Sequence, residues 1–528
     1  MVARGWAPRG RGGGAGVALA ALIPVGALAE GAPLSAIDWL SQVTVTPPSA
    51  STLAAPGEGL GPPLLPGAIA VTSLDGPTTD ALGLMPAARA GLPRDLWGMT
   101  PAARLAEALS ELEPETVPAL QGLILSLLVA ELDPPADAEG RGALFEARLD
   151  RLTAFGALDP ALALIEAAGP ATPALFGRWL DLALLAGDAA APCGALRAEP
   201  ALSRDIAARI YCAARAGDWD LAEALLAGPE GATLAPSVRR LLARFVDPEA
   251  GETPAGLPLV QRPTPLMWQI ADALGEGWAS TQLPLAFAHA DLGPSAAWRA
   301  QIEAAERLAR AGALTPNRLL GLYTQRTPAA SGGVWDRAAA VQRLDAALAM
   351  ASVPGAAPET AAAAGDALVA AWERMAEVEL EHLLAVLMAD RLAELPLEGD
   401  AAAVAWRAGL LAGRTDPAPP PLPGAAARDG FLAAIAKDTL RADTPRPPGA
   451  LPAAIAEGLT IAPAPDVAAL LDEGRRGEVL LTALALMQGG GRDDPRVVSE
   501  ALALLRAAGQ EAVARRAALE ILLLDRRG

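Results

Sequence analysis

The sequence predicts an all-α protein, an α-solenoid of stacked helical hairpins with an irregular N-terminal segment. Residues 202–226 give the first indication, because apolar residues recur there at helical spacing on both sides of Gly217. The second indication is that similar glycine turns lie at Gly156 and Gly187, so that the three glycines are 31 and 30 residues apart. A helix–turn–helix unit repeated at such a period is typical of a solenoid.

One complete hairpin is predicted within residues 202–226. Its first helix carries an apolar stripe at helical spacing, Ile206, Ile210, Tyr211 and Ala214. Gly217 follows, where a left-handed residue ends a helix at least cost, and Asp218 is placed to cap the next helix. The second helix is expected to bury one face, made of Leu221, Ala222, Leu225 and Leu226. Neither helix can bury its apolar side alone, so the hairpin needs neighbours.

The turn of this hairpin, Gly217–Ala222 (GDWDLA), resembles the inter-helix turn of tetratricopeptide-type repeats. The resemblance covers residues 151–228. It implies antiparallel helix pairs stacked side by side, although the period here is shorter than the usual value of about 34 residues.

Residues 1–29 have the pattern of a secretory signal peptide. Arg4, Arg9 and Arg11 precede the apolar run 15–28, and Ala27-Leu28-Ala29 is a cleavage site that predicts cutting after Ala29. The apolar run is shorter than the roughly 20 residues of a spanning helix. We therefore expect a periplasmic protein whose mature chain has no transmembrane segment; the alternative is an uncleaved membrane anchor.

The rest of the chain divides by composition. Residues 30–98 are irregular and contain a candidate docking segment for another protein, Ile37, Trp39 and Leu40, which alternatively folds back on its own domain. Helical periodicity and proline-rich breaks then predict a helical-repeat solenoid at 99–246, a linker at 247–265, a second helical region at 266–414, a proline-rich linker at 415–427 and a C-terminal helical unit at 428–528.

The formal net charge of −19 bears on the choice of partners. A chain this acidic is expected to repel nucleic acid and anionic lipid surfaces. Peptidoglycan and cationic partners remain open. The alternative interpretation is that the charge only keeps an Ala- and Leu-rich protein soluble.

The two cysteines, Cys193 and Cys212, are a candidate disulfide in an oxidising compartment. Cys193 falls near the start of one predicted helix and Cys212 near the end of the next, and consecutive helices of a solenoid run antiparallel. The alternative is a pair of free buried thiols. A redox or metal pair has no support, because there is no C-x-x-C motif and no histidine nearby.

Residues 319–337 contain the densest cluster of polar and aromatic side chains. The candidate ligand or partner residues are Tyr323, Arg326, Ser331, Gly332, Gly333, Trp335, Asp336 and Arg337. Backbone N–H groups of a Gly-Gly turn beside two arginines suit a carboxylate or a sugar. The alternative is an inter-repeat loop in which Ser331 or Asp336 caps the following helix.

No catalytic, metal or cofactor site is predicted. His289 and His382 lack the neighbours of a catalytic triad or an H-E-x-x-H metal site, so both are expected to be structural. Residues 484–488, LALMQ, resemble the G-L-M-Q segment of soluble lytic transglycosylases. The family's Glu-Ser pair is missing, because Gly474 follows Glu473 and Val479 follows Glu478. Only the helical superhelix of that family is carried over, as an analogy of fold.

The whole chain resembles uncharacterised periplasmic, Ala-rich helical-repeat proteins of α-proteobacteria. The likeness lies in the signal peptide, the Cys193/Cys212 spacing, the loop 322–337 and the near-exclusive use of Arg in place of Lys. It implies no activity. We expect a scaffold or assembly factor that binds a periplasmic or envelope protein. The alternative is a cell-wall or glycan-binding protein, or an accessory to a peptidoglycan enzyme. A solute-binding protein is less favoured, because the two-lobed α/β pattern is missing.

Overall fold

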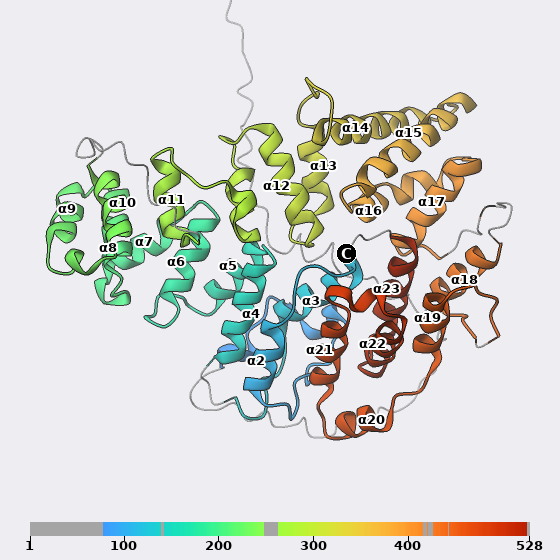
Figure 1. Ribbon diagram of the computed structural model, residues 1–528, viewed down its shortest axis with the longest axis horizontal. Coiled ribbons are helices and arrows are strands. Elements are labelled where there is room, and N and C mark those ends of the chain that lie inside the picture. Colours follow the sequence, from blue (N-terminus) through green and yellow to red (C-terminus); the bar gives the residue numbers. More distant parts are fainter. Residues whose placement is uncertain are drawn as a thin grey trace, which may run out of the picture.

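The computed structural model describes residues 78–138, 142–247, 262–415, 420, 426–441 and 443–524. Within these ranges the protein is all-α, as predicted (Figure 1). The strands found there are two residues each, β1 (Met85–Pro86) and β2 (Ala130–Glu131), which pair in parallel. The predicted leader 1–29 and the docking residues Ile37, Trp39 and Leu40 lie outside the described residues, as do most residues of the two predicted linkers.

The helices form three groups, which we name the base, the arm and the upper lobe. The base contains α2 (Ala102–Ser110), α3 (Pro118–Val129), α4 (Ala143–Ala154), α5 (Leu158–Ala167), α18 (Ala426–Ala436), α19 (Ala450–Thr460), α20 (Pro465–Asp472), α21 (Arg476–Leu486), α22 (Pro495–Ala507) and α23 (Glu511–Leu523). The arm contains α6 (Phe176–Leu185), α7 (Ala190–Ala198), α8 (Ile206–Arg215), α9 (Trp219–Ala227), α10 (Pro236–Val246) and α11 (Pro265–Ala273). The upper lobe contains α12 (Trp298–Arg310), α13 (Pro316–Thr324), α14 (Val334–Ala351), α15 (Pro358–Ala376), α16 (Glu381–Ala393) and α17 (Gly399–Leu411).

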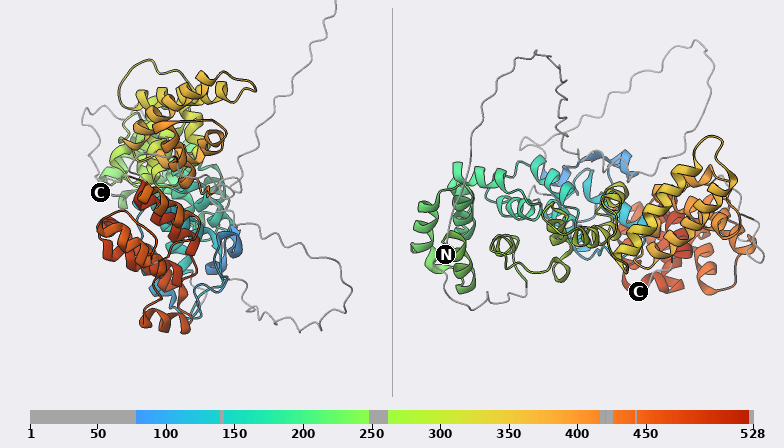
Figure 2. Two further views of the ribbon diagram at one scale, coloured as in Figure 1. Left: turned by 90° about the vertical axis from the view of Figure 1, so that its right-hand side faces the viewer. Right: turned by 90° about the horizontal axis from the view of Figure 1, so that it is seen from above.

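The arm projects from the remainder of the molecule (Figure 1). Seen from above, it extends at one end while α14–α17 occupy the other (Figure 2). Its successive helices pack as neighbours, and α11 returns to contact α6. The ring of Tyr211 on α8 stacks on that of Phe245 on α10, with centroids 5.7 Å apart. The arm is therefore a small bundle closed by α11.

The predicted glycine turns are confirmed. Gly156, Gly187 and Gly217 have φ values of 74°, 86° and 81° and separate α4 from α5, α6 from α7 and α8 from α9. At the third turn the Asp218 amide donates to the Ala213 carbonyl (3.0 Å), and the Asp218 carboxylate accepts from the Leu221 amide (3.3 Å). A residue with a side chain would be strained in the left-handed conformation of Gly217. Glycine is therefore favoured at this position, where the left-handed backbone ends α8.

The predicted buried faces are confirmed for α8 and only in part for α9. Ile206, Ile210, Tyr211 and Ala214 are all buried. On α9 only Ala222 is buried, Leu225 and Leu226 are half-buried, and the expectation for Leu221 is wrong, since it is 45% exposed. The sequence period identifies a helix, but it cannot show how many of its sides have neighbours.

Two hydrophobic cores hold the groups together. The first runs from Met85 to Phe287 and continues with Trp406 and residues of α18–α23, so it joins the arm to the base. The second fills the upper lobe, from Ala288 to Leu411, and includes Leu524. The two meet at η7, a 3-10 helix at Leu285–Leu292.

The two ends of the described chain lie side by side in the base. The Gly477 amide donates to the Leu96 carbonyl (2.9 Å), and the Ala119 amide donates to the carboxylate of Glu520 (2.7 Å). The side-chain amide of Gln510 donates to the Gly91 carbonyl (2.9 Å). An open solenoid brings only neighbouring repeats into contact, so this closure is a feature beyond the predicted hairpins.

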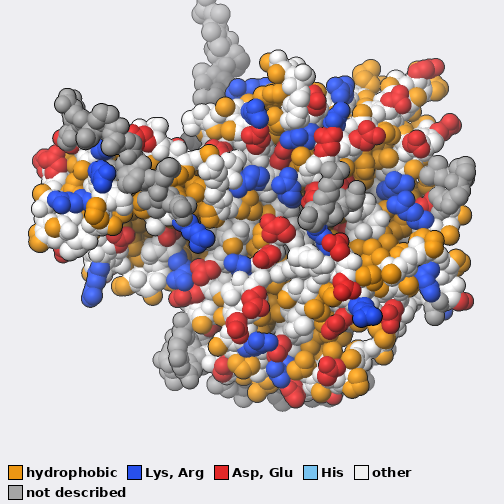
Figure 3. All heavy atoms as spheres, viewed as in Figure 1, with side chains coloured by type: hydrophobic (Ala, Val, Ile, Leu, Met, Phe, Trp, Pro, Cys, Tyr) orange, Lys and Arg blue, Asp and Glu red, His pale blue; other side chains and the backbone are white. Residues whose placement is uncertain are grey.

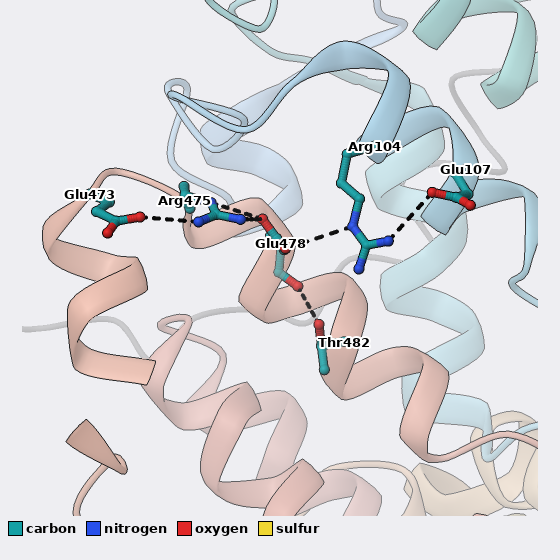
Figure 4. Close-up of polar contacts among 6 residues, drawn as sticks. All are labelled: Arg104, Glu107, Glu473, Arg475, Glu478 and Thr482. Atoms are coloured by element: carbon teal, nitrogen blue, oxygen red, sulfur yellow. Dashed lines mark hydrogen bonds and ion pairs between the residues drawn. The ribbon is translucent and has the colours of Figure 1, made fainter. Parts of the chain in front are cut away.

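A small ion-pair network lies at the same junction, where one pair, Arg104–Glu478, joins α2 to α21 (Figure 4). Arg475 bonds Glu478 (2.6 Å) and Glu473 (3.1 Å), and Arg104 reaches Glu478 at 3.8 Å. Arg104 also pairs with Glu107 at 3.4 Å. Glu478 is the best shielded member, with a side chain 17% exposed. The two glutamates compared above with the transglycosylase residue are thus paired with arginines in the structure.

Arg148 on α4 anchors the first described segment. It is 1% exposed, and its guanidinium donates to the carbonyls of Leu128 (2.7 Å), Leu82 (2.7 Å) and Ala130 (3.1 Å). Burial lowers its pKa to about 10, partly opposed by the negative charge of Asp80. Arg148 therefore stays charged at neutral pH and satisfies carbonyls of two separate segments, around Leu82 and at Leu128–Ala130.

Candidate functional site

The structure divides the predicted loop residues between the core and the surface. Tyr323 and Arg337 are buried around Glu306 of α12. The guanidinium of Arg337 forms a two-point contact with the Glu306 carboxylate at 2.8 and 2.6 Å, and the Tyr323 hydroxyl donates to the same carboxylate at 2.7 Å. These two side chains hold α12, α13 and α14 together and do not face solvent. Burial and the charge of Glu306 raise the pKa of Tyr323 well above its ordinary value.

Trp335 and Asp336 sit at the start of α14. The ring of Trp335 lies 5.0 Å from that of Trp298, whose indole N–H donates to the Leu322 carbonyl (2.8 Å). The Asp336 carboxylate accepts from the Gly332 amide (3.0 Å), which closes the turn before the helix. The Asp336 carboxylate thus has a local partner, but it does not cap the helix as the alternative expected, since α14 has no side-chain cap hydrogen bond.

The remaining loop residues are on the surface. Arg326, Ser331, Gly332 and Gly333 are exposed. The carbonyl of Arg326 is held by the side-chain amide of Gln342 (2.7 Å), which fixes the loop backbone at that point. Ligand binding by this exposed part stays a prediction.

The predicted disulfide between Cys193 and Cys212 is confirmed. It joins α7 to α8 with a Cα–Cα distance of 5.0 Å, and both cysteines are buried. As predicted, the start of one helix meets the end of the next. The bond lies within the arm, beside the helix pair α8–α9.

Replacing both cysteines by alanine is expected to lower the free energy of unfolding by about 3 kcal/mol, the chain-entropy value for a loop of this length. The cysteines are 19 residues apart. Urea denaturation of the C193A/C212A variant, with the wild type as reference, measures the loss. A variant as stable as wild type would show that the bond does not constrain the unfolded chain.

Both histidines have partners in the structure. His289 lies on η7, and its Nε2 atom is 2.6 Å from the Gly156 carbonyl at the α4–α5 turn. This bond links the upper lobe to the base. His382 is buried at the start of α16. Among the described residues, no group of three or more His, Cys, Asp or Glu side chains is arranged to hold a metal ion.

His289 is expected to titrate below its ordinary pKa of about 6.5. Burial lowers its pKa and Arg318 lowers it further, against the Gly156 bond and Asp159, which raise it. The unfolded chain therefore takes up the proton first. Stability should fall as the pH drops through about 6.5, until the folded-state pKa is reached.

The sequence has only two histidines, so a ¹H–¹³C NMR titration resolves this directly. A His382→Gln variant assigns the remaining signal to His289. A His289 midpoint at or above 6.5 would contradict the expectation.

A cleft of about 840 Å³ lies where the base meets the upper lobe. Four segments line it, within residues 114–121, 307–311, 379–382 and 489–493, together with Leu285. They come from the start of α3, the end of α12, the start of α16 and η8 (Gly489–Asp493), which meet near the centre of Figure 1. Its volume is in the range of small-molecule sites.

Sequence reasoning missed this cleft. Its segments are far apart in the chain, and only the closure of the two ends brings η8 beside α3, where the Thr116 hydroxyl donates to the Met487 carbonyl (3.4 Å). Two signals were available. Arg307 and Arg310 share one helix face by their spacing, and three glycines precede Arg492.

No family model, curated protein or solved structure matches this chain.

Within the described part of the chain, one stretch, Ala450–Asp472, is long and apolar enough to cross a membrane, with a mean hydropathy of 1.3. Length and composition alone are weak evidence, because core helices of soluble proteins pass the same test. The stretch comprises α19 and α20, and α19 packs against α22. The absence of a span in the mature chain stays a prediction.

Proposed function

We propose that the protein is exported to the periplasm and serves there as a helical scaffold or assembly factor that binds a partner protein of the cell envelope. The buried Cys193–Cys212 disulfide supports an oxidising compartment. The arm is the part of the chain that we propose to act as a short stack of tetratricopeptide-like hairpins.

Helix α9 carries this proposal. It lies at the far end of the arm (Figure 1) and buries a single side chain, that of Ala222. Trp219 is 47% exposed and Leu221 45% exposed. Large apolar side chains held outward on one projecting helix suit a protein interface, and tryptophan is enriched among the residues that dominate binding energy.

The surface charge fits a protein partner better than a polyanion. In Figure 3, acidic and basic side chains of the described residues are mixed with hydrophobic ones over the visible face. The net charge of −19 disfavours nucleic acid.

Site-specific photo-crosslinking in cells tests the proposal. A photoreactive residue replaces Trp219 or Leu221, and the matched control replaces Glu373, which is exposed on α15 far along the chain. We expect one envelope protein to crosslink from both α9 positions and not from residue 373. Trp219→Ala should weaken its co-purification at least tenfold with an unchanged melting temperature. No adduct, or the same adducts from all three positions, would contradict the proposal.

The location is tested separately. N-terminal sequencing of the protein from a periplasmic fraction should begin at Glu30, the residue after the predicted cleavage site. A protein that keeps residues 1–29 and fractionates with membranes would support the anchor instead.

A glycan-binding role, alone or as an accessory to a peptidoglycan enzyme, is the second candidate. The observation that favours it is the exposed set of Arg326, Ser331 and the Gly332-Gly333 turn beside half-buried Trp335. Sedimentation with purified peptidoglycan tests it, and Arg326→Ala is the informative variant, because Arg326 has no part in the core. Equal sedimentation of the variant and the wild type would remove this loop from consideration.

A further inference from the structure

Three arginines line the central cleft without a carboxylate partner. Arg307 and Arg310 come from α12 and Arg492 from η8, and all three are half-buried. In the described part of the chain, no Asp or Glu oxygen forms an ion pair within 4.0 Å of any of them. Two other shielded arginines do have such partners, since Arg337 pairs with Glu306 and Arg391 with Asp345. Arg148 has none, but its guanidinium is satisfied by backbone carbonyls instead.

The backbone satisfies these guanidinium groups only in part. Arg307 donates to the carbonyls of Ser280 (3.2 Å) and Leu283 (3.4 Å), and Arg310 uses Nε for the Val378 carbonyl (3.0 Å). The Nε atom of Arg492 is buried without a hydrogen-bond partner. A buried donor without a partner is costly, so the arrangement favours an acceptor that is supplied from outside.

Two of these cations also repel each other. Burial lowers the pKa of Arg307, the attraction of Asp291 opposes this, and the weaker repulsion of Arg310 lowers the pKa again. Gln121 fixes the lining of the cleft beside Arg310, because its side-chain amide donates to the carbonyls of Pro114 (2.6 Å) and Arg310 (2.8 Å). An anion between the two arginines would add an attraction for both cations to the one that Asp291 already gives Arg307.

The other titratable groups of the lining set limits on the ligand. Glu115 and Asp493 are exposed, whereas Glu379 and His382 are more shielded and have interactions of their own. Glu379 adopts a left-handed backbone with φ of 60°, which is uncommon for a residue other than glycine. These exposed acids of the lining disfavour an extended polyanion but leave room for a compact charged group.

We infer that this cleft binds a small molecule through an oxyanion group, a carboxylate or a phosphate, held by Arg307, Arg310 and Arg492. The planar guanidinium group matches the geometry of both groups and donates two parallel hydrogen bonds. This inference goes beyond the proposed scaffold role, since the cleft lies outside the arm. A ligand here would join α12 of the upper lobe to η8 of the base.

Titration calorimetry of the purified protein with inorganic phosphate and with citrate tests the inference. We expect saturable binding of at least one of them, weakened at least tenfold by Arg310→Gln and by Arg492→Gln. The matched control is Arg299→Gln, which removes an exposed arginine from the same helix α12 and should leave binding unchanged. Binding of citrate alone identifies a carboxylate ligand, and binding of phosphate alone a phosphate ligand.

A second measurement does not depend on the folding of the variants. Phenylglyoxal modifies arginine side chains, and mass spectrometry of the wild-type protein locates the adducts. Saturating ligand should protect Arg310 and Arg492 and leave Arg299 reactive. Absence of saturable binding to both anions, or equal protection of all three arginines, would overturn the inference.

Discussion

Replacing Arg337 by alanine is expected to lower the free energy of unfolding by about 3–5 kcal/mol, the cost of leaving one member of a buried ion pair uncompensated. The side chains of Arg337 and Glu306 are 10% and 6% exposed. Removal of the cation leaves the Glu306 carboxylate in the core with only the Tyr323 hydroxyl as partner. Urea denaturation followed by tryptophan fluorescence measures the change.

Two further variants separate charge from packing. Arg326→Ala changes an exposed arginine of the same loop and should alter stability by less than about 0.5 kcal/mol. The triple variant E306M/R337M with Tyr323→Phe replaces both charges with apolar side chains of similar size, and it also removes the Tyr323 hydroxyl, which would otherwise lose its acceptor. It should recover most of the loss. A triple variant as unstable as Arg337→Ala would show that the loss comes from packing and not from the unpaired charge.

Replacing Arg148 by methionine is expected to cost about 3 kcal/mol or more. Methionine keeps the bulk but leaves the carbonyls of Leu128, Leu82 and Ala130 without their donor, and an unsatisfied buried group costs about 1–3 kcal/mol. Because these carbonyls belong to the first described segment and to the end of α3, that region should loosen first. Hydrogen exchange should show faster exchange of the Leu84 amide, which donates to the Val129 carbonyl.

Arg178→Met is the matched control for Arg148. Arg178 pairs with Asp150 and Glu146, but its side chain is 34% exposed, and partly solvated pairs contribute about 1 kcal/mol or less. If Arg148→Met were no more destabilising than Arg178→Met, the carbonyls around Arg148 would have to find other donors.

Local features of this fold are readable from the sequence. Gly217 and Asp218 mark a helix end and a helix start within adjacent residues, so their roles depend only on nearby backbone. Cys193 and Cys212 lie on consecutive antiparallel helices, so their pairing needs only the local hairpin. Helical periodicity and the repeated glycine turns were enough to predict the all-α class.

The predicted site residues show which features the sequence alone does not reveal. Tyr323 and Arg337 look like ligand-binding residues in a loop, but the carboxylate that holds them, Glu306, lies 31 residues before Arg337. A cluster of polar residues in sequence does not reveal which side chains point inward. The central cleft is even harder to predict from the sequence, because its four segments come together only after the chain has folded.

The closure of the base has a consequence for how the chain reaches its native state. The hydrogen bond between Ala119 and Glu520 spans 401 residues, and that between Gln510 and Gly91 spans 419. Contacts of such sequence separation raise the contact order and slow folding. During synthesis, helices α2 and α3 emerge long before α21 and α23, which pack against them. The apolar surface of the first helices therefore stays open until the last residues arrive. A chain truncated before α21 would lack the helices that close its base, and we expect it to aggregate through the apolar surface left exposed.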